Sequence, residues 1–475
     1  MINRTHICFL FLIIGATTSK ADEALRSTCI STMRTAAEYY RNKVSNHAGY
    51  VYHYSPDLKV RWGEGQASAS QIWVQPPGTP TVGLAYLHAY RTTRDAFYLD
   101  AATAAAEALV YGQLKSGGWT NSIDFDPKGR VALYRNGKGR GKNNSSLDDG
   151  QTQSAIRFLI ETDAALAFRN KKIHDAAVYG LDALLSAQFP NGAFPQVWTG
   201  PVRGQSASTK TRANYPTYDW KTEGRIKEYW NMYTLNDNVC GYVTDTLIVA
   251  NRVYGGKKFD RAIRRLGDFL IASQMPEPQP GWAQQYNLAM QPIWARKFEP
   301  PAVSGDESQE VIETLFKIYQ HSGDRKYLAP VPKAIAYLER SLLPVGQLAR
   351  YYELKTNRPL YMQRRGKQYS LTYDDSKLPK HYGWKSTSRL ADLKARHKQL
   401  IESKAAVSGR RNVNVRVVKN VVASIDTHGR WMSKYEGERL VGQPKFELGS
   451  EYLSSEVFSQ NLVTLSEYIS QTGRN

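Results

Sequence analysis

The strongest constraint on the fold is a long internal repeat of paired helices. Four segments share one plan: an apolar-periodic helix, a short polar turn, and a second helix. In the second helices apolar residues recur every three or four positions, as expected of helices that bury one face. The four segments span residues 82–113, 155–188, 243–274 and 311–343, with turns at 92–95, 169–171, 255–257 and 322–324.

The length of the repeat narrows the architecture further. Gln113, Gln188 and Gln274 mark successive pairs and are about 80 residues apart, too far for tetratricopeptide or HEAT arrays. A glycine-aromatic corner follows each of these glutamines. We therefore predict an all-α fold, an α/α barrel (toroid) of helical hairpins with long loops on one face. Helices at residues 24–44 and 456–469 would complete the ring.

Strand signals are weak and local. The clearest is the alternation of Val and Arg within residues 414–422. We interpret this segment as a short strand outside the helical repeat.

The first 21 residues have the pattern of an export signal. Arg4 and His6 precede an apolar run over residues 7–14, and Ser19-Lys20-Ala21 suits a cleavage site. The run is too short to span a membrane, and no later stretch qualifies. We expect residues 22–475 to form a single domain that is secreted or periplasmic, soluble and monomeric.

The net charge indicates the kind of partner that such a domain binds, and the cysteine content leaves two interpretations open. A net charge of +20 predicts a polyanionic partner where the charge is concentrated. For an exported protein, an acidic polysaccharide fits this better than nucleic acid, and we expect no nucleic-acid partner. Removal of the leader leaves Cys29 and Cys240, for which a disulfide and two small buried hydrophobic residues are both open interpretations.

The segment of residues 281–308 has no steady helical or strand period, yet it is rich in aromatic residues. Long unpatterned segments inside a compact domain are usually functional or disordered, and this density of aromatic residues argues against disorder. Ser304 and Glu307 form a capping box, which predicts that a helix begins there. Arg296 is therefore expected on an ordered loop just before a helix.

Two short acidic clusters begin the first helices of the second and third hairpins. Residues 147–152 contain Asp148 and Asp149, and residues 235–238 contain Asp237. Asp and Asn are common N-caps, so helix capping alone would explain both clusters. In a toroid, however, equivalent helix starts open onto one face, where converging carboxylates could hold a hard cation such as Ca²⁺.

A set of arginines forms a second group of candidate site residues. A guanidinium binds a carboxylate through two parallel hydrogen bonds, so several of them suit a chain of uronic acids. Alternatively, each is a surface residue or pairs with Asp or Glu. The set comprises Arg296, Arg350, Arg358, Arg364 and Arg365. No serine-protease order, zinc-binding spacing or nucleotide-binding glycine loop is present in the sequence.

Four sequence motifs occur in the order found in one enzyme family. They lie at residues 187–196, 234–238, 294–308 and 350–364. With these motifs the chain resembles the family-10 pectate lyases over residues 113–365. Those are secreted enzymes that cleave polygalacturonate by β-elimination on an α/α toroid with Ca²⁺.

The resemblance implies roles for individual residues. It places calcium ligands at Asp148 and Asp237, and the catalytic base at Arg296. It also implies that Arg350 and Arg364 bind substrate carboxylates. The full set of substrate-binding candidates is Arg350, Arg364, Arg358 and Asp149.

The sequence departs from the family's pattern in several places. The usual Asp-Asn pair is Asp-Asp at residues 148–149, and the Gly-Gly-Trp-Pro corner is Gly-Ala-Phe-Pro at residues 192–195. An expected Ala-Gln-His is Gln-Gln-Tyr at residues 284–286. The loop of residues 199–233 and the extension of residues 405–475 match nothing in the pattern. These departures bear on substrate choice more than on reaction type.

The implied chemistry is β-elimination from a uronic acid. Removing the proton at C5 becomes easier when Ca²⁺ and arginines neutralise the adjacent carboxylate. A guanidinium is normally protonated, which makes Arg296 an unusual base. We expect that crowding by other cations favours its neutral form, so that activity increases at alkaline pH.

Two other functions remain open from the sequence. One is a toroid hydrolase that uses Glu307 and Asp237 as acid and base on acidic oligosaccharides. The other is a polyanion-binding protein without catalytic activity. Chelation and the ultraviolet absorbance of an unsaturated product would distinguish them from a lyase.

Overall fold

The computed structural model describes residues 20–202, 208, 211–222, 226–402 and 413–472. Residues 1–19 of the export signal expected at residues 1–21 therefore lie outside the described residues, and the signal stays a prediction. No helix among the described residues has the length and apolar character needed to cross a membrane.

The four predicted hairpins are present as pairs of antiparallel helices with the predicted turns. The first helix of each pair is followed within a few residues by the second, except that a short 3₁₀ helix (Arg325–Leu328) fills the last turn. The pairs are α2 (Thr79–Thr93) with α3 (Ala96–Tyr111), α4 (Gln151–Ala165) with α5 (Lys171–Ser186), α6 (Val239–Tyr254) with α7 (Lys257–Ala272), and α8 (Gly305–Ser322) with α9 (Val331–Arg340).

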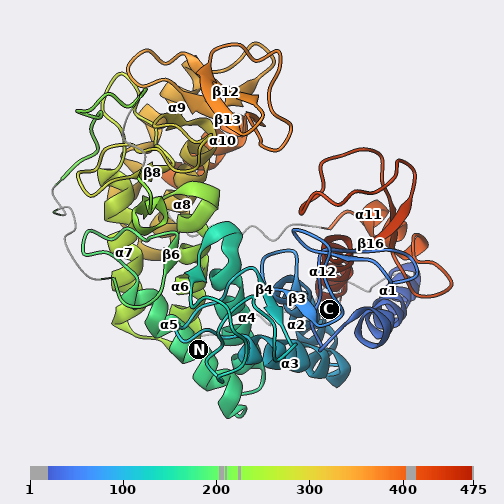
Figure 1. Cartoon of the computed structure of the whole chain (residues 1–475). Coiled ribbons are helices and arrows are strands. Elements are labelled where there is room, and N and C mark those ends of the chain that lie inside the picture. Colours follow the sequence, from blue (N-terminus) through green and yellow to red (C-terminus); the bar gives the residue numbers. More distant parts are fainter. Residues whose placement is uncertain (1–19, 203–207, 209–210, 223–225, 403–412, 473–475) are drawn as a thin grey trace, which may run out of the picture.

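The pairs follow one another around an arc. The first helices of the pairs form one row in which each contacts the next, and α12 (Ser455–Thr472) and α10 (Leu390–Glu402) extend that row at its two ends. The predicted fold class, an α/α toroid of helical hairpins, is confirmed, and its row of pairs follows an open arc (Figure 1).

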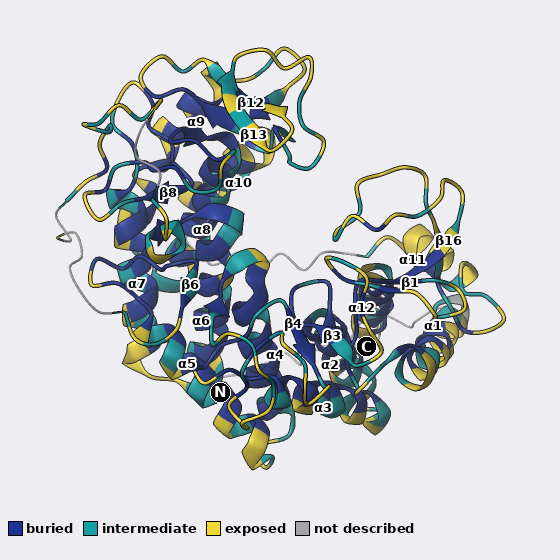
Figure 2. Ribbon diagram, viewed as in Figure 1, coloured by how far each residue is buried: buried dark blue, intermediate teal, exposed yellow. Residues whose placement is uncertain are grey.

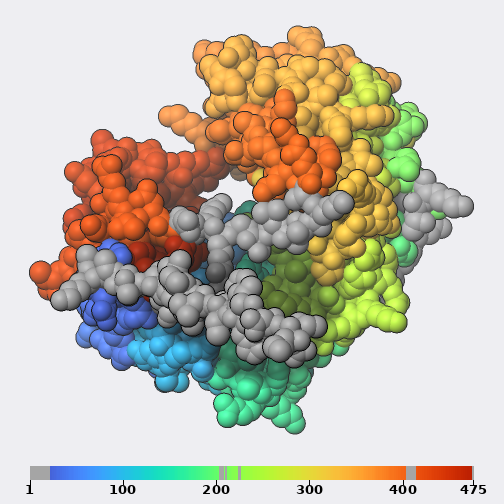
Figure 3. Space-filling view, turned by 180° about the vertical axis from the view of Figure 1, so that it is seen from behind, coloured from blue at the N-terminus to red at the C-terminus, as the bar shows by residue number. Residues whose placement is uncertain are grey.

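The first and the last helix that the structure describes pack together at one end of the arc. Helix α1 (Lys20–Tyr39) continues into a π-helical turn (Tyr40–Val44) and packs against α12, which also covers α2. Seen from behind, the red C-terminal residues lie on the same side of the molecule as the blue N-terminal ones (Figure 3). The predicted helices at residues 24–44 and 456–469 are thus confirmed as one pair.

The marker glutamines explain why the repeat has its period. In the first three pairs the glutamine after the second helix donates from Nε2 to two carbonyl groups, one in the following corner and one in or next to the second helix of the next pair. Gln113 donates to Gly117 and Ala176 at 3.0 and 2.9 Å. Gln188 bonds Gly192 and Ala262, and Gln274 bonds Pro280 and Pro330, all at 3.0 Å. Each glutamine therefore joins one hairpin to the next.

Short strands bring the connecting loops together. β7 (Tyr233–Thr234) pairs with β8 (Gln285–Tyr286), and β11 (Tyr351–Tyr352) lies between β9 (Val303–Ser304) and β12 (Pro359–Arg365). These pairings place the loops before α6 and α8 side by side. The other small sheets contain β3 (Gln71–Trp73) with β4 (Ser122–Asp124), β5 (Ser145–Ser146) with β6 (Val197–Trp198), β10 (Gln347–Ala349) with β14 (Lys385–Thr387), and β13 (Gln368–Thr372) beside β12.

A separate four-stranded sheet lies at the end of the arc where α1 packs against α12. Its order is β15–β16–β1–β2, with β1 (His53–Tyr54), β2 (Arg61–Trp62), β15 (Met432–Lys434) and β16 (Glu451–Ser454). The sheet thus contains strands from both ends of the chain.

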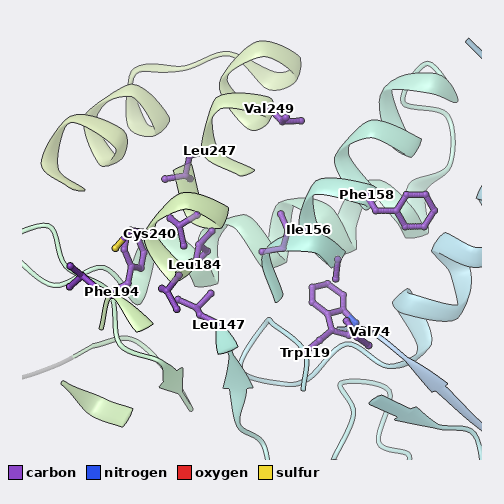
Figure 4. Packing of buried hydrophobic residues seen from close by; sticks show 14 of the residues in the cluster. Val74, Trp119, Leu147, Ile156, Phe158, Leu184, Phe194, Cys240, Leu247 and Val249 are labelled. Carbon is purple, nitrogen blue, oxygen red and sulfur yellow. The ribbon is translucent and has the colours of Figure 1, made fainter. Parts of the chain in front are cut away.

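Buried residues run through the helical pairs, and the loops carry most of the exposed ones (Figure 2). Figure 4 shows part of this core, in which Leu147, Leu184 and Cys240 point toward one another. Cys29 and Cys240 are both free and buried, so the interpretation as small buried hydrophobic residues is confirmed. Leu147 matters most for the site, because it anchors the turn that carries Asp148.

One sequence interpretation is wrong. Residues 414–422 were expected to form a strand, but they begin helix α11 (Val415–Ala423). The side chain of Asn414 caps this helix by accepting a bond from the Arg416 N–H. Val418 and Val421, three positions apart, are buried where α11 packs against α1 and α12. The helical spacing of these two valines determined the structure, and the alternation did not.

Candidate active site

Loops from several hairpins enclose a cavity of about 570 Å³, which we call the central cavity. It lies where the loops before α4 and α6 meet loops from both ends of the arc. Residues from the expected site and residues that the sequence did not indicate both line it. The polar and aromatic ones are Glu64, Gln75, Asp149, Asp237, Tyr242, Arg296, Arg350, His381, Tyr382, Arg439 and Gln443.

Two equivalent turns position the aspartates. Each is a 3₁₀ turn just before the first helix of a hairpin, at residues 148–150 before α4 and 236–238 before α6. The central residue of each turn, Asp149 or Asp237, has a positive φ, at 43° and 51°. Leu147 and Leu235, the residues before the turns, are buried and anchor them.

The aspartates do not cap helices. At neither helix start does a side chain accept a hydrogen bond from a backbone N–H of the first turn. The interpretation of the acidic clusters as simple N-caps is therefore wrong. Left-handed backbone at a residue other than glycine costs energy and often occurs at functional sites, which fits a role in the cavity.

The three aspartates have different partners. Asp148 accepts a bond from Gln196 Nε2 at 2.6 Å, and Asp149 accepts one from Gln75 Nε2 at 3.0 Å. Asp237 instead lies near two guanidinium groups, at 3.6 Å from Arg296 Nη2 and 3.8 Å from Arg350 Nη2. The side chain of Asn236 donates a hydrogen bond to it as well.

The carboxylates also affect one another. Burial raises the pKa of Asp149 to about 6, and the charges of Asp148 and Glu64 contribute to the rise. Burial raises the pKa of Asp237 well above its usual range, with Asp148 and Asp149 contributing again. Asp149 nevertheless keeps much of its surface exposed to water. Negative charges gathered in this way favour a bound cation.

This donor set fits Ca²⁺ only in part. Among the described residues, no three His, Cys, Asp or Glu side chains form a group that could hold a metal ion by themselves. Ca²⁺ prefers six to eight oxygen ligands, which include water and ligand oxygens. Asp148 and Asp237 could therefore supply only part of such a shell, with the remaining ligands coming from water or from a bound acidic sugar.

Arg296 lies on the loop before α8, as expected. Its Nε donates to Glu299 Oε1 at 2.8 Å, and its backbone N–H donates to Glu299 Oε2 at 2.9 Å. Burial lowers the pKa of Arg296, but Glu299 and Asp237 outweigh this effect, and the net pKa is raised. In this arrangement the guanidinium is held in its protonated form.

Arg350 is held by the start of α8. Its Nη2 lies 2.9 Å from Glu307 Oε1, and its Nη1 lies 3.2 Å from Asp306 Oδ2. The ring of Tyr382 lies against the guanidinium, with its centroid 4.7 Å from Cζ. Arg350 therefore reaches the cavity with a fixed orientation.

The helix start that the sequence predicts at Ser304 is confirmed, although the capping box is incomplete. Ser304 caps α8 by accepting a bond from the Glu307 N–H, and its hydroxyl donates to the Glu307 carboxylate, whereas the Ser304 N–H donates to the carbonyl oxygen of Trp282. Glu307 is only 1% exposed and also bonds to Gln284 and Arg350. These contacts enclose its carboxylate, which disfavours the hydrolase that would use Glu307 as acid or base.

Two predicted arginines lie elsewhere. Arg364 is exposed and lines a neighbouring cavity of about 510 Å³ together with Lys377, Lys380 and His381. Arg358 is not among the residues that line the central cavity, and its Cζ lies 3.6 Å from the ring centroid of Tyr373. The structure thus gathers Asp149, Asp237, Arg296 and Arg350 around one space, with Asp148 beside it and Arg364 in the next cavity.

Several cavity residues carried no signal in the sequence. Glu64 and Gln75 come from the first loops of the chain, and Tyr382 follows a β-strand region without a motif. Tyr382 donates to Glu299 at 2.9 Å, and its hydroxyl lies 3.1 Å from that of Tyr351. Only their approach in the folded chain brings these residues to the site.

Comparison with known proteins supports one family for the central part of the chain. Residues 113–317 match the model of a family described as pectic acid lyase, which confirms the predicted resemblance over those residues. No curated protein matches the chain. The family match supports a polysaccharide lyase as the general class of activity.

Solved structures with a related arrangement include a mutant of the family 10 polysaccharide lyase from Cellvibrio cellulosa in complex with trigalaturonic acid. It is 20% identical, with a TM-score of 0.48, over 68% of this chain and 98% of that one. Cellobiose 2-epimerase from Bacillus thermoamylovorans is 14% identical, with a TM-score of 0.47, over 94% of this chain and 100% of that one.

Proposed function

We propose that the protein is a polysaccharide lyase that cleaves polygalacturonate or a related uronic-acid polymer by Ca²⁺-assisted β-elimination outside the cytoplasm. The observation that supports this most is the central cavity, where Arg296 and Arg350 face the carboxylates of Asp149 and Asp237. Three of these residues, Asp149, Asp237 and Arg296, lie within the region that matches the pectic acid lyase family. The mixture of cations and carboxylates suits an acidic sugar bound together with a metal ion.

Arg350 has the clearest part in this chemistry. Glu307 and Asp306 fix its guanidinium, so little rotational freedom is lost when it binds a substrate carboxylate. Positive charge at that carboxylate acidifies the adjacent C5 proton, because it stabilises the negative charge that develops as the proton leaves. Ca²⁺, when bound at Asp148 and Asp237, would add further positive charge at the same place.

In β-elimination the C5 proton passes to a base while the bond between C4 and its oxygen breaks. A double bond forms between C4 and C5, and the departing oxygen takes up a proton. We assign the base role to Arg296, which lines the cavity beside Asp237. Since Glu299 and Asp237 hold the guanidinium protonated, this role requires that their influence on Arg296 is reduced in the substrate complex.

The test is to incubate the purified protein with several uronic-acid polymers, with Ca²⁺ or with a chelator, and to follow ultraviolet absorbance. We expect an unsaturated product from polygalacturonate that depends on Ca²⁺. New reducing ends without absorbance would indicate hydrolysis instead. Salt-sensitive binding without any product would indicate a polyanion-binding protein. Either result would contradict the proposed function.

A further inference from the structure

The loop between β15 and β16, residues 435–450, reaches the central cavity from outside the region that matches the lyase family. Its residues 439–443 line the cavity beside Glu64 and Gln75. In Figure 1 this loop extends from the red end of the arc toward the orange end. We call residues 439–443 the C-terminal loop.

The C-terminal loop is fixed to the end of the arc where α1 packs against α12. His53 Nε2 lies 3.1 Å from the carbonyl oxygen of Val441, and Trp62 Nε1 donates to the carbonyl oxygen of Gly442 at 3.0 Å. Gly442 has a φ of 74° and lies so close to the backbone of Gly63 that no side chain would fit. The loop therefore has a defined position at the rim of the cavity.

The loop also contacts the opposite end of the arc. Arg439 Nη2 donates to the carbonyl oxygen of His381 at 3.3 Å. His381 and Tyr382 line the cavity from that side. Together these contacts make the C-terminal loop a bridge across the mouth of the central cavity.

The charges in the cavity differ in how they are balanced. Arg296 is paired with Glu299, and Arg350 is paired with Glu307 and Asp306. Arg439 forms no ion pair within the described part of the chain, and its side chain is exposed to the cavity. Its single hydrogen bond leaves most of its five N–H donors without a protein acceptor.

The positive charge continues beyond Arg439. His381 and Gln443 line both the central cavity and the neighbouring one, so the two spaces adjoin at these residues. The cations of the neighbouring cavity also form no ion pair with a described residue. They are Arg364, Lys377 and Lys380.

We infer that Arg439 binds a carboxylate of the substrate at a sugar next to the one that is cleaved, so that the C-terminal loop helps to select a uronic-acid chain. The inference rests on the proposed function for its substrate. An anionic chain leaving the central cavity under the loop meets Arg439 first and then the cations of the neighbouring cavity. A neutral polysaccharide would leave these charges without partners.

The test uses the full-length protein and the Arg439→Ala variant with oligogalacturonate. We expect KM to rise about tenfold with kcat nearly unchanged, because a hydrogen-bonded charge pair with the substrate is lost away from the reacting atoms. Arg439→Lys keeps the charge and should recover part of the affinity. Arg416→Ala, which removes an exposed arginine from α11 away from the cavity, should leave KM unchanged.

A second measurement separates this inference from the proposed function. Binding of trigalacturonate and of its methyl ester is measured by calorimetry at low and high salt, without turnover. The Arg439→Ala variant should bind the free acid about tenfold more weakly than the unchanged protein, and with a smaller salt dependence. The two proteins should bind the ester equally well.

Each outcome decides the matter. Equal binding of the acid by both proteins, no binding by either, or a loss of kcat with unchanged KM would overturn the role of Arg439. Weaker binding of both the acid and the ester would show that Arg439 has a structural role, and would also overturn its role in binding a substrate carboxylate. If the unchanged protein forms no unsaturated product but binds the acid through Arg439, the proposed function fails, whereas recognition of a uronic-acid carboxylate by Arg439 stands.

Discussion

The two aspartate turns have the same backbone and different surroundings. Both are 3₁₀ turns with a buried leucine before them, an aspartate at positive φ in the centre, and the first helix of a hairpin after them. Asp149, in the first turn, accepts a bond from the amide of Gln75 and lies near Glu64. Asp237, in the second, lies near Arg296 and Arg350.

This difference shows how a repeated scaffold acquires an asymmetric site. The hairpin repeat sets the two turns side by side, because consecutive first helices are neighbours in the arc. The loops that surround the turns then decide the charge around each carboxylate. We therefore expect the Asp237 side to govern turnover and the Asp149 side to contribute mainly to binding of the cation and the substrate.

The largest expected effect is on the Asp237 side. Arg296→Lys or Arg296→Ala should lower kcat by about 10²- to 10³-fold with a modest change in KM, since a group that acts in the transition state is removed. Steady-state kinetics with polygalacturonate would measure this. Lys297→Ala, which changes the next residue on the same loop, serves as the control. Near-normal turnover of both Arg296 variants would remove Arg296 from the base role.

Matched substitutions in the two turns come next. Asp237→Asn should lower kcat/KM by about tenfold more than Asp149→Asn, because Asp237 lies 3.6 and 3.8 Å from Arg296 and Arg350, whereas Asp149 accepts a hydrogen bond from Gln75. Asp237→Asn should also need more Ca²⁺ for half-maximal activity, as expected when a carboxylate ligand is lost. Equal losses of kcat/KM in the two variants would show that the turns act alike and would contradict the asymmetry.

A third prediction concerns stability on the Asp237 side. Burial raises the pKa of Glu310, in α8, to about 8, and Glu307 and Asp306 contribute. Between the unfolded pKa and pH 8 the folded state holds a proton that the unfolded state has lost, so stability falls as pH rises through this window. Glu310→Gln should remove this fall and stabilise the protein by roughly 1–3 kcal/mol at pH 8. Thermal unfolding between pH 5 and 9 would measure it, and an unchanged slope would contradict it.

The smallest expected effect concerns Asp149. Its pKa is raised to about 6, in the same direction as that of Glu310. In the presence of a chelator, the stability of the folded protein should therefore fall as pH rises from about 4 to 6. Its carboxylate is exposed at one edge, which limits the change to under about 1 kcal/mol. Asp149→Asn should flatten this part of the profile. If Asp148→Asn flattens the profile and Asp149→Asn does not, the pH dependence does not come from Asp149 and the prediction is contradicted.

Much of the scaffold could be predicted because its signals are local. Helix periodicity, polar turns and the N-cap at Ser304 each depend on residues close in sequence, and the structure has all of them. The aspartate turns were recognised as helix starts for the same reason. Their left-handed conformation was not recognised, because Asp149 and Asp237 occur in sequences that resemble ordinary caps.

The remainder of the site depends on distant parts of the chain. Arg439 enters the cavity because β15 and β16 join β1 at one end of the arc, and no local pattern in residues 435–450 indicates this. Arg358 was expected at the site from its motif, but its guanidinium lies over the ring of Tyr373. A motif therefore located the segment, while contacts in three dimensions decided which side chain faces the cavity.

The contact of α12 with α2 has a consequence for how the chain is made. A ribosome releases the first hairpin long before α12, so α2 leaves the exit tunnel without the helix that later covers it. The inner hairpins can assemble as they emerge, whereas the first must wait until α12 has been made. Truncation before residue 455 should accordingly leave an insoluble product, even though every residue of the lyase-like segment is retained.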